Sequence, residues 1–258
     1  MNTERNDMKY QNNHISNVIF RVDFPKILAM DLKEATADFQ KVIIKKFPIV
    51  KEISVDNLHF QIQDRDLSTE KSEEFAWEFV NKDDNKKVFV SSEFIYVEYL
   101  SYLNFEEFYS DIELVFNALI DLYPVEIANR VGLRYINQIE LKEGSAFDWD
   151  NLIHPSLYKF NNEFFSEEDK LARSMHLFEI NEDNNILKFQ FGLFNSEYPN
   201  KISKREFVLD YDCTTSNIEI NDVFNTINQH HLIIKKWFEK SILNGLREEL
   251  VVLQGGIK

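Results

Sequence analysis

Two arginines lie four residues apart in the stretch NRVGLRYIN, which runs from residue 129 to residue 137. Gly132 stands midway between Arg130 and Arg134, and Asn137 closes the stretch. A guanidinium group binds a carboxylate or a phosphate through two parallel hydrogen bonds. Glycine in a strand marks a bulge or a close approach by another backbone or a ligand. The stretch therefore predicts an anion-binding or partner-binding surface formed by Arg130, Gly132, Arg134 and Asn137.

The alternation of RVGLRYINQIEL predicts a strand with Arg130, Gly132 and Arg134 on one face. Val131 and Leu133 then lie on the opposite face, which is apolar enough to be the core face. The arginines have an alternative role, because the sequence holds 44 Asp and Glu against 29 Lys and Arg. They can pair with the protein's own carboxylates on neighbouring strands, and the pattern leaves both roles open. Candidate internal partners are Glu78, Glu98 and Glu140.

A second candidate site is LDYDC, which places Asp210 and Asp212 on the same face of a predicted strand. Paired carboxylates can hold Mg²⁺ for phosphoryl transfer. This pair makes a metal-dependent nuclease or nucleotide-processing enzyme the alternative function. In so acidic a chain, two aspartates on a solvent face are also expected from composition alone.

Other catalytic patterns are absent from the sequence. Cys213 is the single cysteine, which excludes an intramolecular disulfide and a multi-cysteine zinc site, and we expect it to be a small buried or half-buried residue. His230 and His231 are adjacent on a predicted helix, so they cannot chelate as an i, i+4 pair. We expect His231 on the apolar stripe and His230 in solvent. No P-loop, dinucleotide fingerprint or serine elbow occurs. No catalytic residue and no cofactor is predicted, and the sequence names no enzyme.

The composition is that of a folded, acidic protein. The 23 Phe, 10 Tyr and 3 Trp imply a large core, since aromatic side chains bury large areas. A net charge of −15 argues against non-specific binding to nucleic acid or to anionic membranes. No run approaches the roughly 18 apolar residues of a membrane helix, and no signal peptide is evident. We therefore expect a cytoplasmic protein.

Runs of strands followed by helices predict an α+β fold with mostly antiparallel sheets packed by long amphipathic helices. Three helices are expected, over residues 31–47, 105–123 and 222–250. Asn104 and Asn221 are the expected N-caps of the second and third. The strands include NVIFRVDF, NLHFQIQ, FAWEFV, FIYVEYL and REFVLDYDC.

The chain divides into a polar leader over residues 1–16 and two halves, 17–142 and 156–258, joined by a linker-like stretch. FAWEFVNKDDNKKVFV and MHLFEINEDNNILKFQFGL each predict a strand, a turn rich in Asp and Asn, and a second strand. A further strand and a long helix follow in each half. The halves have the pattern of a duplication, and convergence of two similar meanders is the alternative.

Three motifs together resemble an uncharacterised, sporadically distributed prokaryotic protein family of about this length. They are the R-x-G-L-R-Y-I-N core, the preceding YLNFEEF and the terminal WFEKSILNGLREEL. The resemblance covers nearly the whole chain, and its specific part is the arginine–glycine motif. The strand SNVIFRVDF departs from the family pattern because it lacks the prolines that often precede it. The family has no established reaction, and its patchy distribution implies genes of antiphage defence or toxin–antitoxin-like systems.

We therefore expect a non-catalytic binding or regulatory component of such a system. It would engage a protein partner, a second copy of itself, or a nucleotide or other anionic ligand. The binding surface would be the face of Arg130 and Arg134, or else the cleft between the two halves. In a related variant, the acidic surface of the protein masks a basic partner.

Overall fold

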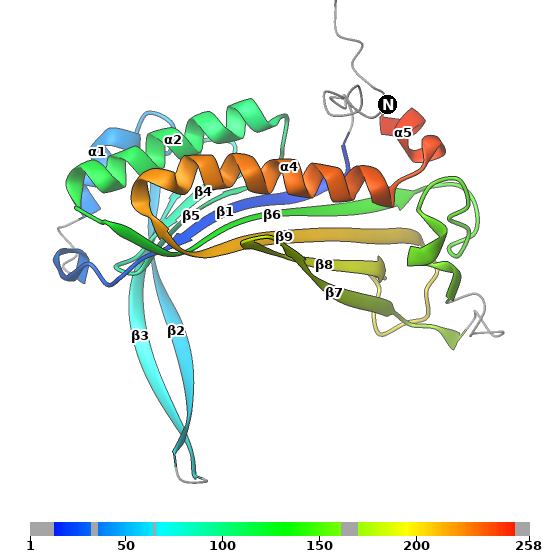
Figure 1. The fold of residues 1–258 in the computed structure, drawn as a ribbon, viewed down its shortest axis with the longest axis horizontal. Coiled ribbons are helices and arrows are strands. Elements are labelled where there is room, and N and C mark those ends of the chain that lie inside the picture. Colours follow the sequence, from blue (N-terminus) through cyan, green and yellow to red (C-terminus); the bar gives the residue numbers. More distant parts are fainter. Residues whose placement is uncertain (1–12, 32–35, 64–65, 161–169, 251–258) are drawn as a thin grey trace, which may run out of the picture. The chain divides into compact units, whose positions relative to one another are not determined.

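The computed structural model describes residues 13–31, 36–63, 66–160 and 170–250, and between residues 54 and 75 it describes the backbone alone. Its nine strands form one antiparallel sheet in the order β2-β3-β4-β5-β1-β6-β9-β8-β7 (Figure 1). The predicted α+β class is confirmed. The strands are β1 (Ile15–Asp23), β2 (Ile49–Gln63), β3 (Asp66–Val80), β4 (Lys86–Val90), β5 (Phe94–Tyr99), β6 (Ile127–Leu141), β7 (Ser174–Glu182), β8 (Asn185–Leu193) and β9 (Arg205–Glu219). The helices are α1 (Thr36–Ile43), α2 (Phe105–Leu122), α4 (Val223–Ser241) and α5 (Asn244–Leu250).

The chain forms two compact units. Unit 1 comprises residues 1–18, 132–215 and 224–258, and unit 2 comprises residues 19–131 and 216–223. The boundaries between the units fall inside β1, β6 and β9. The duplication of two halves stays a prediction. None of the helices in the described ranges combines the length and the apolar run that crossing a bilayer requires.

In unit 2, α1 and α2 pack on one face of the sheet through aromatic side chains. The strand alternation turns Phe20 of β1 towards Phe116 of α2, with ring centroids 6.2 Å apart. The rings of Phe39 of α1 and Phe79 of β3 also pack edge to face, with centroids 5.6 Å apart. The helix predicted over residues 31–47 is shorter than expected: α1 ends at Ile43, and residues 32–35 lie outside the described ranges.

In α4, the prediction was wrong for the two histidines. His230 is fully buried and His231 is half-buried, the reverse of what we expected. The helix also buries Ile227, Ile234 and Ser241, as the predicted apolar stripe required. The full set of buried residues in α4 is Val223, Thr226, Ile227, His230, Ile234 and Ser241.

The single helix predicted over residues 222–250 is two helices, because another segment supplies hydrogen-bond partners where it breaks. The carbonyl of Ser241 accepts from the amide of His154 at 2.8 Å. The amide of Gly245 donates to the carbonyl of Asn151 at 2.9 Å, and that oxygen lies 2.7 Å from where a Cβ of residue 245 would stand. Glycine is therefore needed there.

Two further expectations for this region were wrong. Asn221 does not cap α4, because it lies inside a 3₁₀ turn over Ile220–Asp222. The linker-like stretch is a packed part of unit 1, since Trp149 and Ile153 within it are fully buried.

The β2–β3 hairpin extends well beyond the neighbouring strand β4. Its strands pair along their full length, from Ile49 with Val80 to Gln63 with Asp66. β4 pairs with β3 only at residues 77–80. Residues 54–63 and 66–75 therefore form a two-stranded ribbon of about 33 Å beyond the end of β4 (Figure 1).

Asn104 is the N-cap of α2. As predicted, the side chain of Asn104 accepts a hydrogen bond from the amide of Glu107 at 2.8 Å. Replacing Asn104 with Ala removes this cap, and we expect the free energy of unfolding to fall by about 1 kcal/mol. Asn104→Ser keeps a capping oxygen and serves as the control. Equal urea midpoints for the Ala and Ser variants would contradict the assignment.

Candidate functional site

Arg134 forms a bidentate ion pair with Asp210 within unit 1. Its Nε and Nη2 donate to Oδ1 and Oδ2 of Asp210 on β9, at 2.9 and 2.7 Å. These hydrogen bonds raise the pKa of the Arg134 guanidinium. Asp210 is only 6% exposed, so this buried carboxylate depends on Arg134 for its counter-charge. The guanidinium fork that could have held an external anion is occupied by the protein itself.

In unit 2, Arg130 shares an aspartate with a second arginine. Its Nη1 lies 3.4 Å from Oδ2 of Asp23, and Nη2 of Arg21 lies 2.6 Å from the other oxygen. Asp23 and Asp210 are thus carboxylates that pair with the motif arginines. Glu78, which we considered as a partner, instead lies between Lys51 at 3.3 Å and Lys87 at 3.5 Å.

Asn137 and Gly132 are both buried on β6. Asn137 donates from Nδ2 to the carbonyl of Leu209 at 3.1 Å. Asn137 follows Arg134 by three positions, an odd offset, so the strand alternation places it on the opposite face. The four motif residues therefore do not form one surface.

The outer face of unit 2, opposite α1 and α2, carries an unexpected row of aromatic side chains. Phe89 of β4 and Tyr96 of β5 are half-buried and stack across the strands, with ring centroids 4.2 Å apart and planes 19° apart. Phe94 continues the row at 6.1 Å from Tyr96, and the Arg21 guanidinium lies 4.3 Å from the centre of the Phe94 ring. We call Arg21, Asp23, Phe89, Phe94, Tyr96 and Arg130 the aromatic–arginine face.

Sequence reasoning did not identify this face, although its signal was present. In FIYVEYL the residues between Ile95, Val97 and Tyr99 are Tyr96 and Glu98, so an aromatic residue stands at an outward position of the alternation. Burial, together with the charges of Glu98 and Glu78, raises the pKa of Tyr96.

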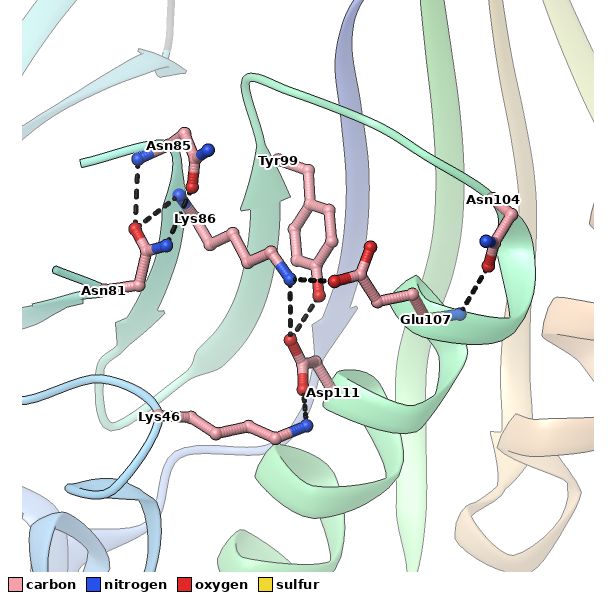
Figure 2. Close-up of polar contacts among 8 residues, drawn as sticks. All are labelled: Lys46, Asn81, Asn85, Lys86, Tyr99, Asn104, Glu107 and Asp111. Carbon is pink, nitrogen blue, oxygen red and sulfur yellow. Dashed lines mark hydrogen bonds and ion pairs between the residues drawn. The ribbon is translucent and has the colours of Figure 1, made fainter. Parts of the chain in front are cut away.

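Behind this face, a buried carboxylate joins α2 to the sheet. Asp111 accepts hydrogen bonds from Lys46 and from the hydroxyl of Tyr99, and Lys86 lies 3.6 Å away (Figure 2). Lys86 also donates to Glu107 at 2.6 Å. Burial and the bond to Asp111 raise the pKa of Tyr99, which keeps its hydroxyl a donor. This cluster holds the elements in place and uses its charges internally.

Three residues that we considered for metal or nucleophilic chemistry, Asp210, Cys213 and His230, are buried and have structural contacts. Asp210 is held by Arg134, and the described part of the chain contains no group of three or more His, Cys, Asp or Glu arranged for a metal. The prediction that Cys213 is buried is confirmed, and burial raises the pKa of its thiol to about 12. His230 contacts Thr215 Oγ1 at 2.7 Å and Asn185 Oδ1 at 3.1 Å in the core of unit 1.

No protein-family model matches the chain, and no curated protein shows significant similarity to it. The resemblance to a prokaryotic family stays an expectation drawn from the arginine–glycine motif. The structure brings the aromatic and arginine side chains of the aromatic–arginine face together on one side of unit 2.

The ion pair of Arg134 can be separated from a ligand-binding role by its effect on stability. We expect Arg134→Ala to lower the free energy of unfolding by about 1.5–3 kcal/mol, because Asp210 stays buried without its counter-charge. A double-mutant cycle with Asp210→Asn should show coupling between the two residues. Lys188→Ala is the control, since that side chain is 52% exposed and its loss costs little. Additive losses in urea unfolding would disprove an internal role.

Asp111 gives a second test. Asp111→Ala leaves Lys46, Lys86 and Tyr99 without their shared acceptor, and we expect it to cost about 3–5 kcal/mol of stability. Glu107→Ala removes a carboxylate that is 41% exposed from the same cluster, and should cost less than about 1 kcal/mol. Thermal and urea unfolding measure both. Similar small losses in the two variants would show that the cluster is not a structural joint.

Proposed function

We propose that the protein is a non-catalytic binding component that engages a protein partner through the aromatic–arginine face of unit 2. The observation that carries the proposal is the stacked row of Phe89, Tyr96 and Phe94 beside Arg21. The solvent face of an antiparallel sheet ordinarily carries polar side chains. Aromatic residues and arginine are instead enriched at protein–protein interfaces and among their energetic hot spots.

The charge arrangement favours a protein over a small anion as the occupant. Arg21 and Arg130 share Asp23, and Lys51 and Lys87 flank Glu78. A phosphate would have to compete with a carboxylate for each of these cations. A protein surface can instead offer both acidic and basic groups in register with the pairs. The net charge of −15 further favours a basic partner.

The family resemblance and the internal similarity of the chain extend this proposal. The resemblance carried by the arginine–glycine motif suggests a cytoplasmic component of a prokaryotic defence or toxin–antitoxin-like system. The hairpins β3–β4 and β7–β8 have similar sequences and suggest pseudo-repeated halves. In each half, strands of the sheet would be packed by a long amphipathic helix, α2 in one and α4 in the other.

Affinity capture from the native host tests the binding role. We expect the tagged protein to retain a stoichiometric protein partner, identified by mass spectrometry. Tyr96→Ala combined with Phe89→Ala should weaken binding of the purified partner at least about tenfold, as loss of interface hot spots does. Leu103→Ser is the control, because Leu103 is 67% exposed and lies outside the face.

Two results would overturn the proposal. One is a partner that binds the double variant as tightly as the unchanged protein, with both folded by circular dichroism. The other is retention of a nucleotide or nucleic acid in place of any protein, which would favour the phosphate-processing alternative.

A further inference from the structure

A shallow groove of 480 Å³ lies between α1 and α2 in unit 2. One wall is Val42 of α1, which is 47% exposed. The floor and the other wall come from α2. The lining residues are Val42, Glu113, Leu114, Asn117, Ala118, Asp121 and Leu122.

The α2 residues form two parallel rows because they repeat every four positions. Leu114, Ala118 and Leu122 make an apolar row of about 12 Å, since each step of four residues rises about 6 Å. Ala118 is only 4% exposed, so the exposed apolar surface of the groove comes from Val42 and Leu122, with Leu114 half-buried beside them. A helix with the same i, i+4 ridge can pack along this row.

The electrostatics of the groove are negative from two sources. Its ionisable lining residues, Glu113 and Asp121, are both acidic and exposed, and they stand in the row beside the leucines. The last turn of α2, which ends at Leu122, contains no basic residue. The partial negative charge of the helix C-terminus therefore adds to that of Asp121.

We propose that this groove binds a basic amphipathic helix of a protein partner. The apolar side chains of that helix pack against Val42, Leu114 and Leu122, and two of its lysines or arginines pair with Glu113 and Asp121. A second copy of this chain is disfavoured by its net charge of −15. The groove uses none of the residues of the aromatic–arginine face, so this site stands independently of the proposed function.

Two synthetic peptides probe the site directly. One is a 21-residue amphipathic helix of Leu and Lys, and the other has Glu in place of every Lys. By fluorescence anisotropy with the full-length protein, we expect the Lys peptide to bind at least about tenfold more tightly than the Glu peptide. The double variant Glu113→Lys/Asp121→Lys should abolish or reverse this preference. Both residues are exposed, so we expect the variant to fold.

A matched variant separates the groove from overall charge. Asp83→Lys/Glu93→Lys makes the same change in net charge at two exposed acids outside the groove, and should leave the preference intact. Tyr96→Ala should also leave it intact, which distinguishes failure of this site from failure of the aromatic–arginine face. An equal loss of preference in Asp83→Lys/Glu93→Lys, or equal binding of both peptides, would overturn the proposal. So would a dimer in sedimentation that the groove variant dissociates, because a second copy would then be the occupant.

Discussion

A buried carboxylate is tolerated only where other groups surround and compensate it, and Asp111 is such a group in unit 2. Its partners come from three places: Lys46 after α1, Lys86 on β4 and Tyr99 on β5. Each of them must approach from the helix-covered side of the sheet. Because side chains alternate along a strand, this requirement also determines which side chains of β4 and β5 face outward. The aromatic row on the outer face is thus positioned by a charge on the inner one.

The motif arginines illustrate how an acidic protein uses its scarce cations. Arg134 neutralises the buried Asp210, and Arg130 shares Asp23 with Arg21. Glu78 is likewise compensated by lysines from the two neighbouring strands. These cations pair with carboxylates of the sheet, whereas α2 carries five acids and no base. The α1–α2 groove, whose lining holds two acids and no base, is one result.

Features set by neighbouring residues could be predicted from the sequence. The β6 strand with its buried Val131 and Leu133, and the Asn104 cap, depend on alternation and on a side chain three residues from its target. Features set by distant segments could not. Strand order alone brings Asp210 beside Arg134, and the segment around Asn151 breaks the terminal helix by competing for its backbone. The exchange of His230 and His231 had a smaller cause: neighbouring residues point about 100° apart around a helix, so both lie near the edge of one apolar stripe and its pattern alone does not decide between them.

The β2–β3 ribbon leaves strand edges beyond β4 that the described sheet does not cover. Such edges are templates for pairing between molecules, and charge is the usual protection against it. Residues 66–75 contain four acids and one lysine, whereas residues 54–63 contain a single acid and the alternating Leu58, Phe60 and Ile62. This part of β3 therefore carries more protective charge than the matching part of β2, so the edge of β2 is the weaker barrier to pairing between molecules.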